Sequence, residues 1–432
     1  MRLEPGFTAC TLTGMLRFAL ALLLAGPLLH AAMHAADTAA FDWPQWCGRL
    51  RQPLSDESKW KRTWPADGPR QLWRAKVGKG YAAVSVSNGR VFTAGNDGNS
   101  DTIWCLDAQS GAVVWKHSYP CQGGGGGFPG PRVAPTIDGE LLYTQNVQGT
   151  LLCLESATGK PRWEQDLGKL KRTRGAKFWH GASCHPLIAG DVLIMESGGQ
   201  RGNLAGFNKL TGELLWQSGD FKLGYGTPVH AVINGEPTVV AFTGSAVAGL
   251  APQDGKVRWS YPCEVEYQCS IATPIVSADK IFVSSYYYDQ GSVLLQIGGG
   301  VATPLWHSKE MLNHFNCSAL WQDHLYGFHG YAQKQDKSKG ATYLGCVDFK
   351  TGKLKWSHNL GGSGGLLIAG GTILALTENG ELLTAEASPA GFKVISRAQV
   401  LGGTCWTMPV LCNGRIYCRD HAGTLLCLDV SE

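Results

Sequence analysis

The sequence carries little charge for its length. Asp, Glu, Lys and Arg make up 17% of the 432 residues, and the formal net charge is only +4. A charge balance this close to neutral gives no broad basic surface, which argues against nucleic acid as the partner. Long helical patterns are scarce, and the one long apolar run lies at the N-terminus. The sequence therefore favours a protein built from strands and turns.

Familiar signatures of catalysis are missing as well. The chain contains no His-Glu-x-x-His motif. The run Gly123–Gly127 is not followed by Lys-Ser/Thr and a helix, so it does not match a phosphate-binding loop. We interpret it as a flexible loop that ends in the rigid segment Phe128–Pro131.

Glycine and tryptophan are abundant, with 57 and 15 copies. One ten-residue pattern organises many of them: an apolar strand end, a polar residue, a turn that contains Gly, and a second strand that closes on Trp. The copy Leu106–Trp115 reads Leu-Asp-Ala-Gln-Ser-Gly-Ala-Val-Val-Trp. Gly suits the positive φ of such a turn. The recurring indole buries a large flat surface, which suits a wedge between neighbouring units.

The closing tryptophans recur at intervals of 42 to 53 residues. Several short strands fit into each interval, and this period is typical of a propeller. The sequence predicts an all-β, eight-bladed β-propeller of four-stranded antiparallel blades. The predicted blade-docking tryptophans are Trp73, Trp115, Trp163, Trp216, Trp259, Trp306 and Trp356.

The two ends of the repeat array are complementary. The segment Leu72–Val77 is a Trp strand without the three strands that should precede it, while Trp406–Val430 has three strands and lacks a Trp strand. Joined together they form one blade, so that an N-terminal strand closes the ring and no sheet edge stays open. Six complete units, one degenerate unit that ends near Ile395 and this composite give eight blades.

The N-terminus has the features of a signal peptide. Arg2 and Arg17 precede the apolar core Phe18–Leu29, and small residues follow it. We expect a signal peptide over residues 1–36, with cleavage somewhere within 31–40. The apolar core is too short for a membrane span. These features predict a periplasmic or secreted protein without a transmembrane span after signal removal.

Residues 37–71 are rich in Trp and Pro and lack strand alternation. We interpret them as an extended arm that aromatic side chains pin to the side of the propeller. Residues 72–432 form the predicted propeller itself.

The sequence contains 14 cysteines. Four of them recur at one repeat position, and equivalent positions on successive blades lie far apart, so they read as buried apolar side chains. These four are Cys105, Cys153, Cys346 and Cys427. Cys263 and Cys269 are the pair best placed for a disulfide. Cys10 lies in the predicted signal peptide. Thirteen cysteines remain after its removal, and because this number is odd, at least one thiol stays free.

Chain direction sorts the loops of the predicted ring. The short turns fall on one face and the long, variable loops on the other, where binding sites are usually built. Residues just before the innermost strands ring the channel at this variable face. Their aromatic and basic side chains suit an anionic or planar ligand, although aromatic residues also fill propeller channels as ordinary packing. The residues of this predicted channel mouth are Tyr81, Arg132, Trp179, His180, His185, Tyr225, Gln268, His314, Phe315 and Trp406.

Two other groups of residues are weaker candidates. His180, His185 and His230 lack the spacing and the acidic neighbours of a metal site, so structural roles are the better interpretation. Five positive charges between Lys169 and Lys177 indicate either a solvated loop or a contact for an anionic surface or polysaccharide.

The repeat Leu-Asp-x-x-Ser/Thr-Gly-x-x-x-Trp resembles the tryptophan-docking repeat of the PQQ-like (pyrrolo-quinoline quinone repeat) β-propeller family, in its secreted bacterial form. The resemblance covers roughly residues 41–430. The further segments that carry it are Asp42–Trp46, Ala272–Val276, Asn313–Phe315, Ala385–Pro389, Val400–Gly403 and Tyr417–Asp420.

The resemblance implies a fold more firmly than a chemistry. Quinone-dependent dehydrogenases of this family bring a disulfide between adjacent cysteines, a calcium site and a catalytic Asp or His. This sequence has no adjacent cysteines, and none of the other motifs can be placed in it. We therefore expect no cofactor, no metal and no catalytic residue. The expected function is that of an exported binding or scaffold protein with a protein or glycan partner. The alternative is a periplasmic oxidoreductase that uses PQQ with calcium.

Overall fold

The structure is a computed structural model that describes residue 1 and residues 41–432 except 124–127, 171–180, 199–201, 288–290 and 331–341. The chain separates into two units, residues 1–40 and residues 41–432. The predicted signal peptide and its cleavage region lie outside the described residues. Among the described residues, no helix has the length and hydropathy needed to cross a membrane.

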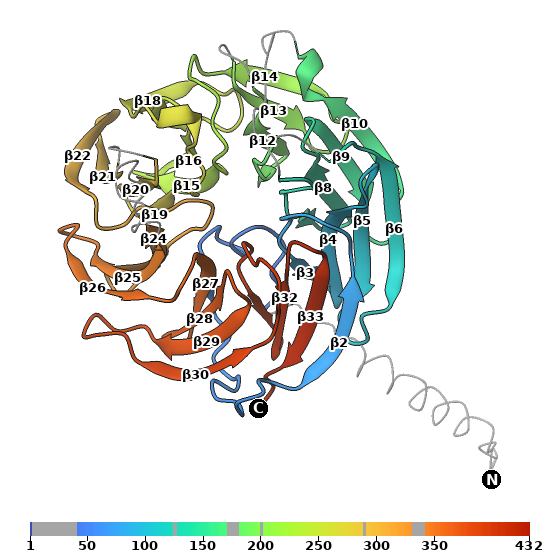
Figure 1. The fold of residues 1–432 in the computed structure, drawn as a ribbon. Helices are drawn as coiled ribbons and strands as arrows, with labels where there is room; N and C mark the ends of the chain where they lie inside the picture. The colour runs from blue at the N-terminus through green and yellow to red at the C-terminus, as the bar shows by residue number, and fades with distance from the viewer. Residues whose placement is uncertain (2–40, 124–127, 171–180, 199–201, 288–290, 331–341) are drawn as a thin grey trace. The chain divides into compact units, whose positions relative to one another are not determined.

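Residues 41–432 form eight antiparallel sheets arranged around a common axis (Figure 1). Each sheet is one blade, and its strands follow one another from the axis outwards. This confirms the predicted eight-bladed, all-β propeller. The blades are numbered here from the sheet that contains β3. In the described part of the chain there are two 3-10 turns: η1 (Leu167–Lys169) follows the outer strand of the second blade, and η2 (Glu266–Gln268) follows that of the fourth.

The strand bounds of blades one to four are β3 (Ser85–Ser87), β4 (Arg90–Asn96), β5 (Ser100–Asp107) and β6 (Val113–Pro120); β7 (Thr136–Asp138), β8 (Leu141–Gln145), β9 (Thr150–Glu155) and β10 (Pro161–Asp166); β11 (Leu187–Ala189), β12 (Val192–Glu196), β13 (Leu204–Asn208) and β14 (Leu214–Ser218); β15 (Val229–Ile233), β16 (Glu236–Phe242), β17 (Ala246–Leu250) and β18 (Val257–Pro262).

The strand bounds of blades five to eight are β19 (Ile275–Ser277), β20 (Lys280–Ser285), β21 (Gly291–Gly298) and β22 (Val301–Ser308); β23 (Ala319–Trp321), β24 (His324–Gly330), β25 (Thr342–Asp348) and β26 (Leu354–Asn359); β27 (Gly364–Ala369), β28 (Thr372–Thr377), β29 (Glu381–Glu386) and β30 (Val394–Gln399); β31 (Val410–Cys412), β32 (Arg415–Arg419), β33 (Thr424–Asp429) and β2 (Gln71–Lys76). A short strand, β1 (Leu54–Ser55), adds to blade seven in parallel with β27.

Burial explains why the inner and outer strands differ in sequence. Strands such as β28 are buried along their whole length, because neighbouring blades cover both faces of the sheet. Outer strands such as β18 alternate between buried and exposed positions. In β18, Trp259 is the buried residue. Continuous apolar runs and half-apolar runs therefore mark the two kinds of strand.

The docking tryptophans connect each blade to the next. A register shift accompanies Trp115, where Cys105 pairs with Trp115 and Leu106 pairs with Val113. This bulge turns the outer strand locally, a usual effect of an extra residue. The indole N–H groups of six of the seven tryptophans donate to a backbone carbonyl of the following blade. These bonds run from Trp73 to Ala108, Trp115 to Ser156, Trp163 to Lys209, Trp216 to Pro252, Trp306 to Phe349 and Trp356 to Ser388.

Blade seven has no docking tryptophan, and the arm compensates. Ser396 occupies the corresponding place on β30, where it pairs with Thr384. The backbone N–H of Trp64 donates to Ser396 Oγ, and that hydroxyl donates to the carbonyl of Trp64, both over 3.1 Å. Trp60 is completely buried in the adjoining core. Since blade eight is made from the two chain ends, it has no hairpin turn that would receive an indole.

The ring closes as predicted. Strand β2 pairs antiparallel with β33, and Trp73 lies opposite Cys427. The buried guanidinium of Arg419 reinforces the junction between blades eight and one by donating to the carbonyls of Ala82 and Ala94 over 2.7 and 2.8 Å. A charged group that is buried in this way must satisfy its donors with acceptors of the protein, and carbonyls from two segments of blade one do so here.

The path of the arm differs from the prediction. Only its second part, residues 58–71, lies along the side of blades seven and eight. The first part crosses the face that carries the short turns, where the innermost strands have free backbone groups that need partners. Its contacts with blades one, three, five and seven are Trp43 with Val86, Arg51 with Pro186, Gln52 with Val276 and β1 with β27.

The cysteines of the described residues are all free thiols. The four repeat cysteines are buried, as predicted. The predicted pairing of Cys263 with Cys269 is wrong, because both are free. The sulfur of Cys47 on the arm instead shares a hydrogen bond with the sulfur of Cys317, next to blade six.

Candidate functional site

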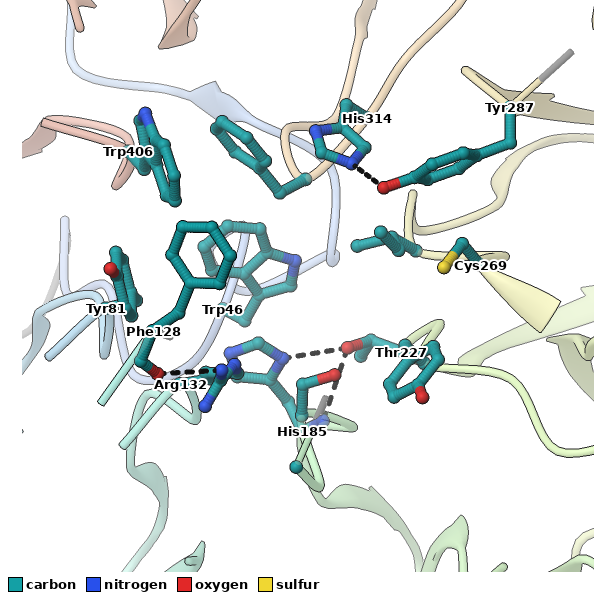
Figure 2. A pocket seen from close by; sticks show the side chains of 15 residues that line it. Trp46, Tyr81, Phe128, Arg132, His185, Thr227, Cys269, Tyr287, His314 and Trp406 are labelled. Atoms are coloured by element: carbon teal, nitrogen blue, oxygen red, sulfur yellow. Dashed lines mark hydrogen bonds between the residues drawn. The ribbon is translucent and has the colours of Figure 1, made fainter. Parts of the chain in front are cut away.

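A cavity of about 260 Å³ opens at the end of the channel formed by the variable loops. Figure 2 shows aromatic side chains around most of it. Seven residues of the predicted channel mouth line it. They are Tyr81, Arg132, His185, Tyr225, His314, Phe315 and Trp406. Among the described residues, fifteen line the cavity, and the structure thus brings together side chains from seven of the eight blades.

The arm supplies the residue that the sequence did not place there. Trp46 lines the cavity, and its Nε1 donates to Thr273 Oγ1 over 3.0 Å on blade five. Because the arm crosses the opposite face of the ring, this indole forms the inner wall of the cavity. The other lining residues outside the prediction are Phe128, Gly181, Ser183, Thr227, Cys269, Ile271 and Tyr287.

His185 lies face to face with Trp46. The two ring centroids are 4.8 Å apart and the planes differ by 13°. The Nδ1 atom lies 2.8 Å from Thr227 Oγ1, while Nε2 is buried and has no hydrogen-bond partner. Burial lowers the pKa of His185 well below its usual value, and the positive charge of Arg51 lowers it further. The imidazole is therefore neutral at physiological pH.

Among the lining residues that the structure describes, Arg132 is the only charged side chain. Its guanidinium donates to the carbonyls of Phe128 and Gly130 over 2.9 and 3.2 Å. The same group lies 5.8 Å from the ring centroid of Tyr81, which is a cation–π distance. Burial lowers the pKa of Arg132, but an arginine remains charged at physiological pH.

Ring contacts link the aromatic residues of this face into one continuous series, which we call the aromatic track. Neighbouring centroids along it lie 4.4 to 6.4 Å apart. Two of its rings, Tyr267 and Phe128, are exposed at 57% and 44%. The members of the track are Tyr267, Tyr287, Tyr286, His314, Phe315, Trp406, Tyr81, His421 and Phe128.

The loop that carries Tyr267 has an unusual backbone. Tyr267 and Gln268 both have positive φ, at 55° and 58°, which is uncommon for residues other than glycine. Such conformations persist only where the surroundings hold them, and they concentrate at functional sites. Gln268, a predicted mouth residue, does not line the cavity and lies in a neighbouring hollow with Lys222 and Glu264.

Several predicted residues lie elsewhere. His230 is on β15 and does not line the cavity. Trp179, His180 and most of the basic run lie outside the described residues. Lys169 of that run pairs with Asp166 over 3.1 Å at the surface. Within the described part of the chain, no three His, Cys, Asp or Glu side chains gather in a way that could hold a metal ion.

The cavity is better equipped for binding than for acid–base or nucleophilic chemistry. In the described part of its lining there is no Asp or Glu. Cys269 is the one thiol, and burial raises its pKa to about 11, so it stays protonated and weakly nucleophilic. His314 Nε2 is hydrogen-bonded to the hydroxyl of Tyr287 over 2.9 Å.

Comparison with known proteins places this geometry in a family. A family model described as outer membrane protein assembly factor BamB matches residues 102–343, more than half of the chain. The chain belongs to this family of PQQ-like propellers. The repeat that the sequence showed is thus the repeat of the family, as the resemblance implied.

Three individual proteins illustrate the relationship. Outer membrane protein assembly factor BamB of Moranella endobia is 21% identical over 337 residues, which cover 74% of this chain and 80% of that protein. The crystal structure of BamB from Moraxella catarrhalis has a TM-score of 0.61 at 16% identity and covers 84% of this chain and 100% of that one. Quinohemoprotein alcohol dehydrogenase from Comamonas testosteroni has a TM-score of 0.66 at 14% identity and covers 91% and 81%. At such low identity the two structures show the fold alone.

The dehydrogenase relatives raise the question of whether a quinone with calcium fits this cavity. Calcium prefers several carboxylate or carbonyl oxygens as ligands, and the described lining residues offer no carboxylate. Among these same residues, a quinone that bears several carboxylates would meet one cation, Arg132. The donor set of the described lining residues therefore fits neither the ion nor the cofactor.

Proposed function

We propose that this protein is an exported, non-catalytic propeller that binds a protein partner through the cavity and aromatic track of its variable-loop face. The observation that carries the proposal is the cavity itself, whose described lining residues combine aromatic walls from several blades with one half-buried cation and no carboxylate. Buried aromatic and arginine side chains dominate the binding energy at protein interfaces. A closed ring holds them in place, so little entropy is lost when a partner binds.

Two further points support the proposal. The family match is described as an assembly factor rather than as an enzyme. The N-terminal segment, with two arginines ahead of the apolar core Phe18–Leu29, has the pattern of a secretory signal, which supports a periplasmic or secreted location.

The test is an affinity capture from cell-envelope extracts of the source organism with matched variants. We expect the wild-type protein and an Arg74→Ala control, changed at an exposed position of β2, to capture the same partner. The double variant Arg132→Ala/Phe315→Ala should lose that partner, and binding of the purified partner should then confirm the difference. Equal capture by all three proteins, with unchanged melting temperatures, would remove the cavity as the binding site.

The quinone-dependent oxidoreductase is tested separately. Addition of PQQ and Ca²⁺ to the purified protein should produce neither dye reduction nor a rise in melting temperature. Saturable stabilisation together with turnover would overturn the non-catalytic function.

A further inference from the structure

Several hydrogen-bonding groups around the cavity are engaged within the protein, whereas Nε2 of His185 has no partner. Trp46 Nε1 donates to Thr273, and Trp406 Nε1 donates to Glu378 Oε1 over 2.6 Å. The hydroxyl of Tyr287 is hydrogen-bonded to His314. A sugar carries a hydroxyl on nearly every carbon, and each buried hydroxyl needs a partner. A cavity with so few polar groups to spare favours an occupant that is mostly apolar.

The charge of the cavity adds a second constraint. The described lining residues include one cation, Arg132, and no anion. Its guanidinium has five N–H donors, and the bonds to the carbonyls of Phe128 and Gly130 leave others for a ligand. A carboxylate is the group that pairs best with such a donor in a partly buried place.

The size of the cavity sets the third constraint. An apolar cavity of ~150 Å³ takes one benzene ring. At about 260 Å³, this cavity has room for one aromatic side chain and a short piece of the backbone that carries it. It is too small for a folded domain or for a long section of polysaccharide.

A segment of the chain itself, Phe128 with Pro129, packs against the other rings of the aromatic track. The ring of Phe128 lies 5.5 Å from Trp406 and 6.4 Å from Tyr81, and the carbonyl of Pro129 lies 3.4 Å from His421 Nε2. This extended Phe-Pro segment thus packs its ring on the track and hydrogen-bonds through its backbone. Figure 2 shows Phe128 at the left of the cavity, with Trp406, His314 and Tyr287 along the top and Arg132, His185 and Thr227 along the bottom.

Building on the proposed function, we propose that the cavity binds the aromatic side chain of an extended, proline-containing protein segment, and that a carboxylate of the same segment pairs with Arg132. Aromatic grooves recognise such segments because proline restricts the backbone before binding, which lowers the entropy cost. Phe315, between His314 and Trp406, is the wall residue expected to contact the incoming ring.

The test uses a fluorescein-labelled peptide, Glu-Pro-Phe-Pro-Glu, with the full-length mature protein and fluorescence polarisation. Two matched peptides carry Ser in place of Phe, or Lys in place of both Glu. We expect saturable binding of the first peptide and at least tenfold weaker binding of each matched peptide. Phe315→Ala and Arg132→Ala should weaken the first peptide by a similar factor. If the alanine variants fold poorly, Phe315→Leu and Arg132→Lys are used in their place, because the first keeps most of the side-chain volume and the second keeps the charge. Arg74→Ala should bind like the wild type.

The outcomes separate this proposal from the one on which it rests. Equal binding of all three peptides, or binding that Phe315→Ala and Arg132→Ala leave unchanged, would overturn the peptide assignment. Saturable binding of chitohexaose that is lost in Phe315→Ala, with no peptide binding, would replace the protein segment by a glycan while keeping the cavity as the site. If capture of the partner is also unchanged by the cavity variants, the proposed function fails as well.

Discussion

The indole of Trp46 and the imidazole of His185 stack at 4.8 Å, although the two residues belong to the arm and to the third blade. This contact joins the inner wall of the cavity to a segment that crosses the opposite face of the ring. The arm is therefore part of the cavity wall as well as a cover for the channel.

Replacement of Trp46 by alanine should loosen the arm. The loss of a buried indole costs about 3–5 kcal/mol in comparable cores, and it also removes the donor to Thr273 Oγ1. We expect a lower urea midpoint and faster proteolysis between residues 41 and 57. Trp46→Phe keeps most of the stacking, so its urea midpoint should lie between those of the wild type and Trp46→Ala. A Trp46→Ala protein with the wild-type midpoint would show that the arm contributes little to stability.

Glu196 should make stability depend on pH. One of its carboxylate oxygens accepts the N–H of Gly224 over 2.7 Å and the other has no partner, and burial raises its pKa to about 8. The native state therefore keeps this proton above the usual pKa of 4.5, at which the unfolded chain releases it. The contribution of this group to stability is complete below pH 4.5 and is lost as the pH rises towards 8.

Glu196→Gln removes this titration. We expect the variant to exceed the wild type by at least ~1 kcal/mol at pH 8 and to differ less at pH 5. Urea unfolding at both pH values measures the difference. The exposed Glu213→Gln should shift neither curve, and a pH-independent effect of Glu196→Gln would argue against the raised pKa.

Two glycines in matched conformations separate backbone strain from packing. Gly111 has φ of 72° and Gly89 has φ of 69°. A Cβ on Gly111 would lie 2.6 Å from Trp73 Cδ2, whereas a Cβ on Gly89 meets no atom within 4 Å. Both alanine variants lose roughly 1–2 kcal/mol to the left-handed backbone. Gly111→Ala should lose about 1–3 kcal/mol more, because the indole must move. Equal urea midpoints for the two variants would show that the indole yields without cost.

Cys47 and Cys317 should form a disulfide on oxidation. Their sulfur atoms already share a hydrogen bond, and that bond with Cys47 holds the pKa of Cys317 at about 7, against the opposing effect of burial. With diamide as the oxidant, the two thiols lose two protons and two electrons, which reduce the N=N bond of diamide to a hydrazine. Peptide mapping without reduction should show this crosslink between the arm and the ring, and Cys317→Ser should abolish it. A map with other disulfides and these two thiols intact would contradict the prediction.

The sequence predicted the ring because each blade repeats its own local chemistry. Gly111 and Trp115 mark a hairpin whose pattern can be recognised within a single repeat unit. The match between the two chain ends follows from the number of strands that each end carries. The path of the arm has no such local signal. Trp46 finds its partner Thr273 more than two hundred residues away, and nothing periodic in residues 41–57 announces that contact. The mouth residues on the blades followed from the predicted ring, whereas Trp46 and the docked ring of Phe128 did not.

The order in which the chain is made gives the closing strand a biological consequence. The arm and β2 leave the ribosome first, yet their partners β27 and β33 are among the last segments to appear. Until those segments arrive, the earliest strand has an open edge and the arm has no place to dock. A truncated product that lacks β27 and β33 therefore leaves the edge of β2 unpaired and the arm undocked. Unpaired strand edges of this kind are prone to aggregation and are the surfaces that chaperones bind.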